Sequence, residues 1–357
     1  MTQRNESDPP TPTPRPHLTG NVPGIGGRIK EKVHDFEVEE IGAYPLRGDG
    51  PHYFLWVQKR GVDARSMQDA VARRYGVERR DIGTAGHKDR QAITRQWVSI
   101  PAKKGLPEPV QEELADGIEI VAVTRHGNKL RTGHLKGNRF SIRIRGASVQ
   151  GEKLIESVET VAARLQKEGV PNYYGMQRFG DGFSTLHAGW EWVKGGDPPR
   201  DRFLRGMAAS AIQSEVFNRV LARRLVENTW KTVLAGDIFE KLDSGGRFWI
   251  EESEREETQR RVDSGEIAIT GPMPGSRTGV AEKEAGALES EILAGMGLQS
   301  DDFNSLGRRG RGTRRPLVVS VNDLTVSVEP PDEVLVRFSL PAGSYATVVL
   351  REFMEPA

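Results

Sequence analysis

Strand patterns lie near both ends of this sequence, and a long helix-rich stretch separates them. Lys32–Ile41 alternates polar and apolar residues as a half-buried strand does, and Tyr53–Gln58 is rich in strand-forming residues. The strand pattern returns in Leu324–Glu329 and Val334–Leu340, whereas Arg202–Val226 has apolar residues at helical spacing. We therefore expect an α+β fold in which the last strands complete the first sheet around an inserted second lobe.

Changes in composition set the expected domain boundaries. Met1–Thr19 is polar and rich in proline and cannot bury enough apolar surface to fold, so we expect a disordered tail there. Residues 20–168 form the first part of the expected main domain, 169–318 the inserted domain, and 319–357 the strands that close the main domain. The basic, glycine-rich Gly307–Arg315 is expected to be a linker.

The chain of 357 residues contains no cysteine. This excludes disulfides, a thiolate nucleophile, an iron–sulfur cluster and cysteine-ligated zinc. No apolar run approaches the ~20 residues that a membrane-spanning helix needs. The first residues also lack the basic and apolar regions of a signal peptide, so we expect a cytoplasmic protein without a membrane partner.

The charged residues are unevenly distributed, although 51 Lys and Arg nearly balance 50 Asp and Glu. Arg125–Arg139 and Gly307–Arg315 are basic and contain no acidic residue, while Glu251–Glu257 supplies negative charge. Basic stretches of this kind contact a phosphate backbone or form ordinary solvated surface. Charge alone leaves both interpretations open.

The most unusual local string is TAGHKDRQAITRQWVSI, residues 84–100. Its glycine-containing turn brings Lys88, Asp89 and Arg90 together, and a strand-forming run follows at once. A carboxylate held beside cations stays ionised, so it can act as a nucleophile or a base. The alternative is a charged hairpin turn, which spacing alone would favour.

This string closely resembles the catalytic signature of the TruD family of pseudouridine synthases. Further segments match the family in its own order, namely Lys30 with Asp35-Phe36, GHLKGNRF (133–140), GVPNYYGMQRFG (169–180), GPMPG (271–275) and LPAGSYATVVLRE (340–352). The matches extend from about residue 27 to residue 352, which is nearly the whole of the chain expected to fold.

The resemblance implies both a fold and a reaction. It implies a catalytic domain with a mixed, largely antiparallel sheet, an inserted α/β TRUD domain, and a cleft between them with Asp89 at its floor. It also implies that a uridine in tRNA, typically uridine 13, is isomerised to pseudouridine without cofactor or metal. The glycosidic bond breaks, the uracil turns, and a carbon–carbon bond forms through C5. The implied partner is tRNA, and we expect a monomer.

The resemblance also assigns roles to individual residues. By similarity Asp89 is the catalytic aspartate, and its covalent attack or its action first as a base both stay open. Lys30 matches the basic position expected to pair with it, and Lys88 is the competing candidate. The positions expected to bind the substrate are Phe36, Asn138, Phe140 and Tyr345, the last standing where relatives usually have Phe. The positions expected to contact the RNA backbone are Lys88, Arg131, Lys136, Arg139, Gln177 and Arg178.

Structural alternatives remain for some of these residues. Aromatic residues in strands are more often core than site. Gln177 and Arg178 could equally lie in a structural hinge set by nearby glycines.

Two other classes of function fit the sequence less well. An RNA-binding or tRNA-folding module that has lost catalysis would keep a basic cleft and could lack the carboxylate, but Asp89 stands in an intact motif. A metal-dependent nuclease or zinc deaminase fits less well, because there are no cysteines and the seven histidines show no HExxH-type spacing.

Overall fold

The computed structural model describes residues 9–103, 105, 107–329 and 332–355, and its largest element there is a nine-stranded sheet. The strand order is β14-β15-β7-β1-β4-β2-β6-β5, and β3 pairs with β4 at the side of this path. The strands are β1 (Phe36–Gly42), β2 (His52–Arg60), β3 (Gly83–Thr84), β4 (Ile93–Pro101), β5 (Glu112–Ala115), β6 (Ile118–His126), β7 (Leu135–Ile144), β14 (Asn322–Glu329) and β15 (Glu333–Pro341).

The pairing of these strands confirms a mixed, largely antiparallel sheet. Only the β1–β4 pair is parallel, and the other strand pairs of this sheet are antiparallel. β15 pairs with β7, so strands from the end of the chain complete a sheet begun near its start. The expected α+β fold is therefore found.

Helices cover this sheet at both ends. α1 (Ala64–Tyr75) buries Met67 and Val71 on the β2–β4–β6 part, and Gly76 ends it in the left-handed region with φ 63°. The N-cap is Asp63, whose carboxylate accepts a hydrogen bond from the Ser66 amide. α2 (Glu152–Glu168) packs against β14 at the other end, and α7 (Ala346–Met354) packs against α2.

The inserted part of the chain is built around the long helix α4 (Arg202–Val226). It packs against α3 (Ser184–Val193), α6 (Lys283–Ala294) and β11 (Ile267–Met273), one of the two inner strands of a four-stranded sheet. That sheet also contains β9 (Phe239–Lys241), β10 (Arg247–Phe248) and β12 (Thr313–Pro316), and α5 (Arg255–Asp263) packs beside β11.

Two short strands lie where this inserted part begins and ends. β8 (Val170–Pro171) pairs with β13 (Val318–Val319) in a two-stranded sheet. The two chain positions proposed as domain boundaries, 169 and 318, thus lie side by side. The division into domains itself stays a proposal.

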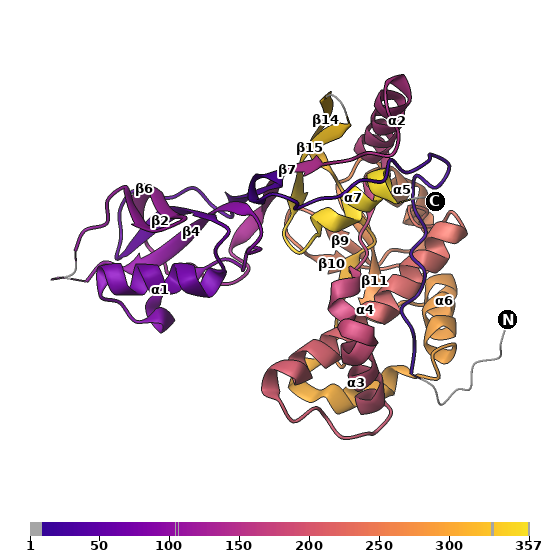
Figure 1. Cartoon of the computed structure of the whole chain (residues 1–357). Coiled ribbons are helices and arrows are strands. Elements are labelled where there is room, and N and C mark those ends of the chain that lie inside the picture. The colour runs from indigo at the N-terminus through magenta and orange to yellow at the C-terminus, as the bar shows by residue number, and fades with distance from the viewer. Residues whose placement is uncertain (1–8, 104, 106, 330–331, 356–357) are drawn as a thin grey trace.

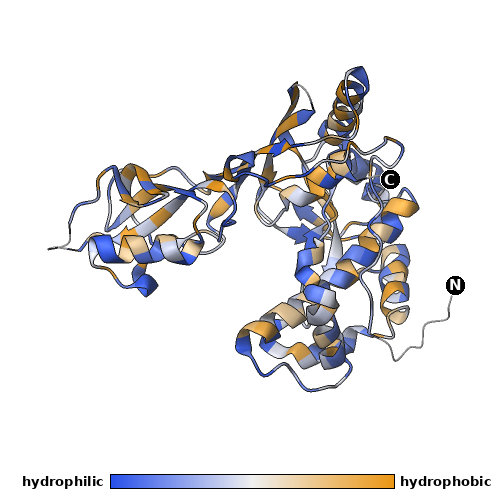
Figure 2. Ribbon diagram, in the orientation of Figure 1, coloured by the Kyte–Doolittle hydropathy of each residue, from blue (hydrophilic) through white to orange (hydrophobic). Residues whose placement is uncertain are grey.

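The molecule is elongated (Figure 1). The lobe that carries α1, β2, β4 and β6 extends to one side, and the inserted helices lie on the other. Each side has its own hydrophobic segments (Figure 2). The α1 lobe has a separate core that includes Leu55, Tyr75 and Ile120, whereas the main core runs from β7 and β15 into the inserted part. No helix within the described ranges is long and apolar enough to cross a membrane.

The structure differs from the expected disordered tail at residues 9–19, while residues 1–8 lie outside the described part. The Thr13 amide donates to Glu215 in α4, and Thr19 donates through its amide and hydroxyl to Glu352 in α7. Leu18 is buried in the main core. A polar, proline-rich segment can be placed in this way because partners distant in sequence accept its backbone donors.

The segment expected to be a linker, 307–315, is also more regular than its composition suggests. Residues up to Arg309 belong to a 3-10 helix, and Thr313–Pro316 forms β12, paired with β11. The Arg314 side chain is fully buried and donates to Glu289, so it is not available for a phosphate. This arginine has a structural partner that charge patterning could not reveal.

Candidate active site

The Lys30 ammonium and the Asp89 carboxylate form an ion pair at the surface of the main domain. Lys30 Nζ lies 2.5 Å from Asp89 Oδ2, and the two side chains are 25% and 55% exposed. Lys30 precedes β1, and Asp89 lies in the turn between β3 and β4. The parallel β1–β4 pairing brings these segments together. The expected pairing of Lys30 with Asp89 thus has the required geometry.

Lys30 has an unusual backbone conformation. Its φ is 60°, in the left-handed region that residues with a Cβ seldom adopt. The Gln91 side chain donates to the Lys30 carbonyl, and the Lys30 ammonium lies 4.2 Å from the centre of the Phe36 ring. Strained residues of this kind concentrate at functional sites, where surrounding contacts hold them.

Lys59 anchors the turn that carries Asp89, and the sequence analysis missed it. Lys59 lies in β2 with no exposed surface, and its ammonium donates to the carbonyls of Asp89, at 2.5 Å, and Val62, at 2.9 Å. Burial lowers the pKa of Lys59 to about 8, against the opposing attraction of Asp89 and Asp63. The sequence contains one indication of this role. Lys59 follows Leu55 and Val57 at every second position of the strand, so its side chain is expected on the same buried face.

We expect Lys59→Met to change how stability depends on pH. Between pH 8 and the ordinary lysine pKa of 10.5, the unfolded chain binds one more proton at Lys59 than the folded chain. The free energy of unfolding of the wild type should therefore rise relative to the variant by about 1.6 kcal/mol from pH 8 to 9.5. Urea unfolding at several pH values measures this difference. Lys103→Met, at an exposed lysine paired with Asp81, should run parallel to the wild type. Parallel curves for Lys59→Met would show that Lys59 titrates normally.

Lys88 points into the sheet, although it is adjacent to Asp89 in sequence. Its side chain is 6% exposed, and its ammonium donates to Asn138 Oδ1 at 2.6 Å and lies 3.4 Å from Glu40 Oε2. Glu40 lies opposite Asn138 in the antiparallel β1–β7 pair. The structure therefore contradicts the expectation that Lys88 contacts the RNA backbone, because adjacent side chains of an extended segment point to opposite sides and Lys88 is turned away from Asp89.

The aromatic residues of the predicted site share a face of the sheet with Asn138. Phe36 and Phe140 are 4% and 7% exposed, and their rings meet edge to face with centres 6.4 Å apart. Phe140 also stacks on Phe338 of β15. Gly137, just before Asn138, has no room for a Cβ, which would lie 2.1 Å from the Leu340 carbonyl oxygen. Both predicted phenylalanines thus pack in the core beside the half-buried Asn138.

A second group of predicted residues lies past the end of β15. Tyr345 is 37% exposed, and its hydroxyl accepts a hydrogen bond from Arg178 at 2.9 Å. Arg178 and Arg315 both lie over the Tyr174 ring, at 5.0 and 4.3 Å from its centre. Among the residues that the structure describes, no hydrogen bond or ring contact joins Tyr345 to Asp89 or Asn138. Gln177 is exposed beside Arg178.

The basic residues before and within β7 fall into two sets. Arg131 and Lys136 are exposed. Arg139 is exposed but forms an ion pair at 2.8 Å with Glu39, on the opposite face of the sheet from Asn138 and Phe140. The structure thus leaves the first two cations available to a polyanion near β7, and separates Arg139 from the other predicted residues.

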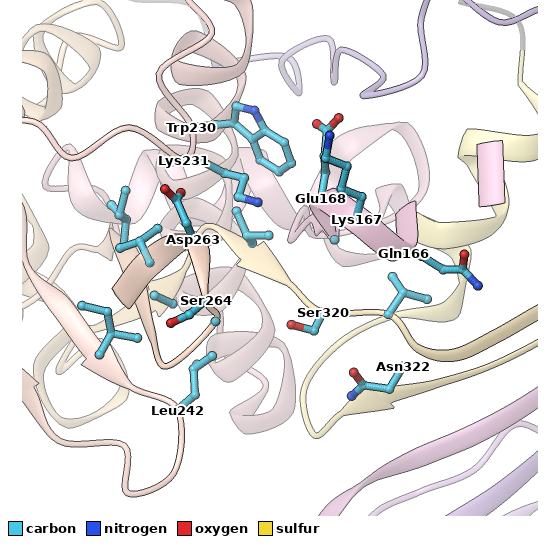
Figure 3. A pocket seen from close by; sticks show the side chains of 18 residues that line it. Gln166, Lys167, Glu168, Trp230, Lys231, Leu242, Asp263, Ser264, Ser320 and Asn322 are labelled. Atoms are coloured by element: carbon cyan, nitrogen blue, oxygen red, sulfur yellow. The ribbon is translucent and has the colours of Figure 1, made fainter. Parts of the chain in front are cut away.

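Two cavities lie along the segment that follows β12. One, of about 540 Å³, is lined by Lys136, Gly137 and Leu340 from the large sheet and by Asn172 and Arg315 from the inserted part. The other, of about 240 Å³, lies between the end of α2 and β11, with Trp230, Lys231 and Asp263 in its wall (Figure 3). None of the predicted site residues lines this second cavity.

The site chemistry is that of a carboxylate, ammonium groups and amides. In the part of the chain that the structure covers, no group of three or more His, Cys, Asp or Glu side chains is placed to hold a metal ion. An ionised carboxylate next to an ammonium group can attack an electrophilic carbon or accept a proton.

Comparison with known proteins gives consistent matches over most of the chain. The family model described as tRNA pseudouridine synthase D (TruD) matches residues 15–196 and 201–353. A tRNA pseudouridine synthase D from Anaeromyxobacter sp. (strain Fw109-5) is 40% identical over 349 residues, covering 96% of this chain and 97% of the relative. One from Thermus thermophilus is 40% identical over 340 residues, covering 95% and 92%.

A solved structure shares the fold. The TruD structure from Methanosarcina mazei superimposes with a TM-score of 0.75 at 22% sequence identity, covering 94% of this chain and 95% of that one. At this identity the likeness supports the α+β architecture alone.

Proposed function

The chain belongs to the tRNA pseudouridine synthase D family, an isomerase family that converts uridine to pseudouridine, and we propose that it acts on uridine 13 of tRNA with Asp89 as the catalytic carboxylate. The observation that carries this proposal is the 2.5 Å ion pair between Asp89 and Lys30, formed by two segments that both match the family. A tRNA substrate also supports the expectation of a cytoplasmic protein.

The proposed chemistry is a rearrangement that consumes no second substrate. The bond from the ribose C1′ to N1 of uracil breaks, a bond from C1′ to C5 forms, C5 loses a proton and N1 gains one. Electrons balance without an oxidant or a reductant. Asp89 either attacks the substrate covalently or first removes a ribose proton, and an ionised carboxylate serves in both cases.

Other residues contribute by positioning. Lys30 holds Asp89 by charge and hydrogen bond, and Lys59 holds its backbone. A base that leaves its stack needs a surface and hydrogen-bond partners. On the sheet, Asn138 would supply the hydrogen-bond partner, with Phe36 and Phe140 packed beside it in the core. Tyr345 with Arg178 would reach the RNA from the inserted side. The RNA would then lie between the main and the inserted parts.

The proposed activity is tested directly with the purified protein and a tRNA transcript, without added metal. Carbodiimide modification followed by primer extension should give a new stop one nucleotide 3′ of position 13, and none in a transcript with cytidine there. A stop at another uridine would keep the synthase activity and overturn the position. No stop in any tRNA would overturn the proposed function.

We expect Arg131 and Lys136 to contribute to RNA affinity through phosphate contacts. In the double variant Arg131→Gln/Lys136→Gln, the slope of log affinity against log salt concentration should decrease by up to about two, because two fewer counterions are released. Filter binding at several salt concentrations measures the slope. The control is Arg255→Gln/Arg260→Gln on α5, where both arginines already pair with glutamates. An unchanged slope in the first variant would place the RNA elsewhere.

A further inference from the structure

Asn138 is held by a buried ion pair that the proposed reaction does not use. Glu40 and Asn138 face each other across the β1–β7 pair, so their side chains leave the same face of the sheet. Lys88 reaches down from the turn that carries Asp89 and contacts both. The Glu40 side chain has no exposed surface, and its other oxygen accepts a hydrogen bond from the Trp97 amide at 3.3 Å.

This contact fixes which end of the Asn138 amide faces inward. A lysine ammonium has three donors and no acceptor, so the Asn138 atom within 2.6 Å of it must be the carbonyl oxygen. The amide nitrogen then points away from Lys88. Within the described part of the chain that nitrogen has no hydrogen-bond partner, and Asn138 itself is half-buried. Asn138 can therefore present two N–H donors and no acceptor.

We propose that the buried Glu40–Lys88 pair fixes the Asn138 amide so that it offers only donors to the target base, and that Asn138 thereby selects uracil over cytosine. This inference rests on the proposed function. Uracil has a carbonyl oxygen at C4, whereas cytosine has an amino group there. The Asn138 N–H groups and the cytosine amino group are all donors, so they form no hydrogen bond with each other. Both are removed from water when the base binds, and this makes cytosine bind more weakly. Asn138 is the specificity-determining residue, and Lys88 and Glu40 are positioning residues.

The two charges act as a unit because each is costly alone. Burial raises the pKa of Glu40, and the Lys88 charge opposes this rise. Burial lowers the pKa of Lys88, and the Glu40 charge opposes this fall. Removing one partner leaves the other as an unpaired buried charge, which lowers stability. Neutral residues of similar size at both positions avoid that cost. The test therefore uses a double variant.

The experiment measures the ratio of dissociation constants for two tRNAs that carry cytidine or uridine at the target position. The parent is the Asp89→Asn variant, which prevents turnover of the uridine tRNA. In the parent the cytidine tRNA should bind about 10- to 100-fold more weakly, because a buried donor loses its partner. The wild type is assayed separately for pseudouridine formation, so that failure of the proposed function can be distinguished from failure of this inference.

Two changes added to the parent should move the ratio in different ways. Asn138→Asp presents an oxygen acceptor to the base, so the ratio should shift by about tenfold or more toward cytidine. Glu40→Gln/Lys88→Met frees the amide to turn over, so the ratio should fall to within about threefold of one. Glu31→Gln, at an exposed glutamate paired with Arg28, is the control and should leave the ratio unchanged.

The inference is overturned if the wild type is active and both changes leave the parent ratio intact, even if they lower stability. That result would assign Glu40 and Lys88 a structural role only. Asn138 is partly exposed, so Asn138→Asp keeps the test decisive should the double variant fail to fold. If the wild type makes no pseudouridine, the proposed function fails, and this inference fails with it.

Discussion

Replacing Asp89 by asparagine is expected to lower the rate of pseudouridine formation by at least roughly 1000-fold, the effect seen when a catalytic side chain is removed from an otherwise intact site. Asparagine keeps the size of the side chain but can neither attack covalently nor accept a proton. Because Asp89 is 55% exposed, the change should not disturb folding. The measurement is single-turnover conversion of a tRNA transcript, followed by the carbodiimide stop.

The control for this prediction is Asp81→Asn. Asp81 precedes the same turn and pairs with the exposed Lys103, so its loss should leave the rate within about twofold. The affinity of Asp89→Asn for tRNA should stay within a few fold of the wild type, since phosphate contacts dominate binding. If Asp89→Asn stays active while the protein is folded, the catalytic assignment is wrong.

Asp35→Ala is expected to lower the free energy of unfolding by about 2–3 kcal/mol, because it removes charge-assisted hydrogen bonds from a carboxylate without exposed surface, while Arg145 keeps its ion pair with Glu333. The Asp35 side chain has no exposed surface and accepts two hydrogen bonds from Arg145 Nε and one from Nη2, at 2.7–3.0 Å. It also accepts from the Lys32 amide, which shapes the turn between Lys30 and Phe36. Urea unfolding at pH 7 measures the loss. The nearby exposed pair offers a control, since Glu31→Ala should cost at most about 1 kcal/mol.

The stability difference between the wild type and Asp35→Ala should depend on pH. Burial alone would raise the pKa of Asp35, but the hydrogen bonds from Arg145 and Lys32 and the charge of Arg145 lower it below the ordinary value of 3.8. Stabilisation by Asp35 is therefore fully present above about pH 4 and is lost as the pH falls through the lowered value. The difference between wild type and Asp35→Ala should shrink between pH 4 and pH 2. A difference that stays constant over this range would contradict the assignment.

The periodicity of the sequence was enough to predict several strands of the large sheet. The expected strands at Lys32–Ile41, Tyr53–Gln58 and Val334–Leu340 correspond to β1, β2 and β15, because alternation reports which face of a strand is buried. The same alternation places Glu40 and Lys59 on the buried face among apolar residues. Charged residues at such positions were the available signal for the polar network under the site, and composition alone did not reveal it.

Contacts between segments that are far apart in the chain could not be predicted from the sequence. The order of residues 9–19 depends on Glu215 and Glu352, each more than 200 residues away. The buried Arg314 donates to Glu289, which lies in a different element, α6. Local composition describes what a segment can do alone, whereas these segments are ordered by the partners that meet them.

The sequence by itself determined the family and the α+β class, and it led to the proposal that Asp89 in the GHKDR turn is the catalytic carboxylate. Only the tertiary structure decided which cation meets that carboxylate. Lys88 is adjacent to Asp89 in the chain, yet Lys30, 59 residues away, forms the ion pair, and Lys88 turns inward to Glu40 and Asn138. The physical reason is that neighbouring side chains of an extended segment point to opposite sides, so Lys88 and Asp89 face in opposite directions. The parallel pairing of β1 with β4 then brings Lys30 to the exposed side, where the Asp89 carboxylate lies.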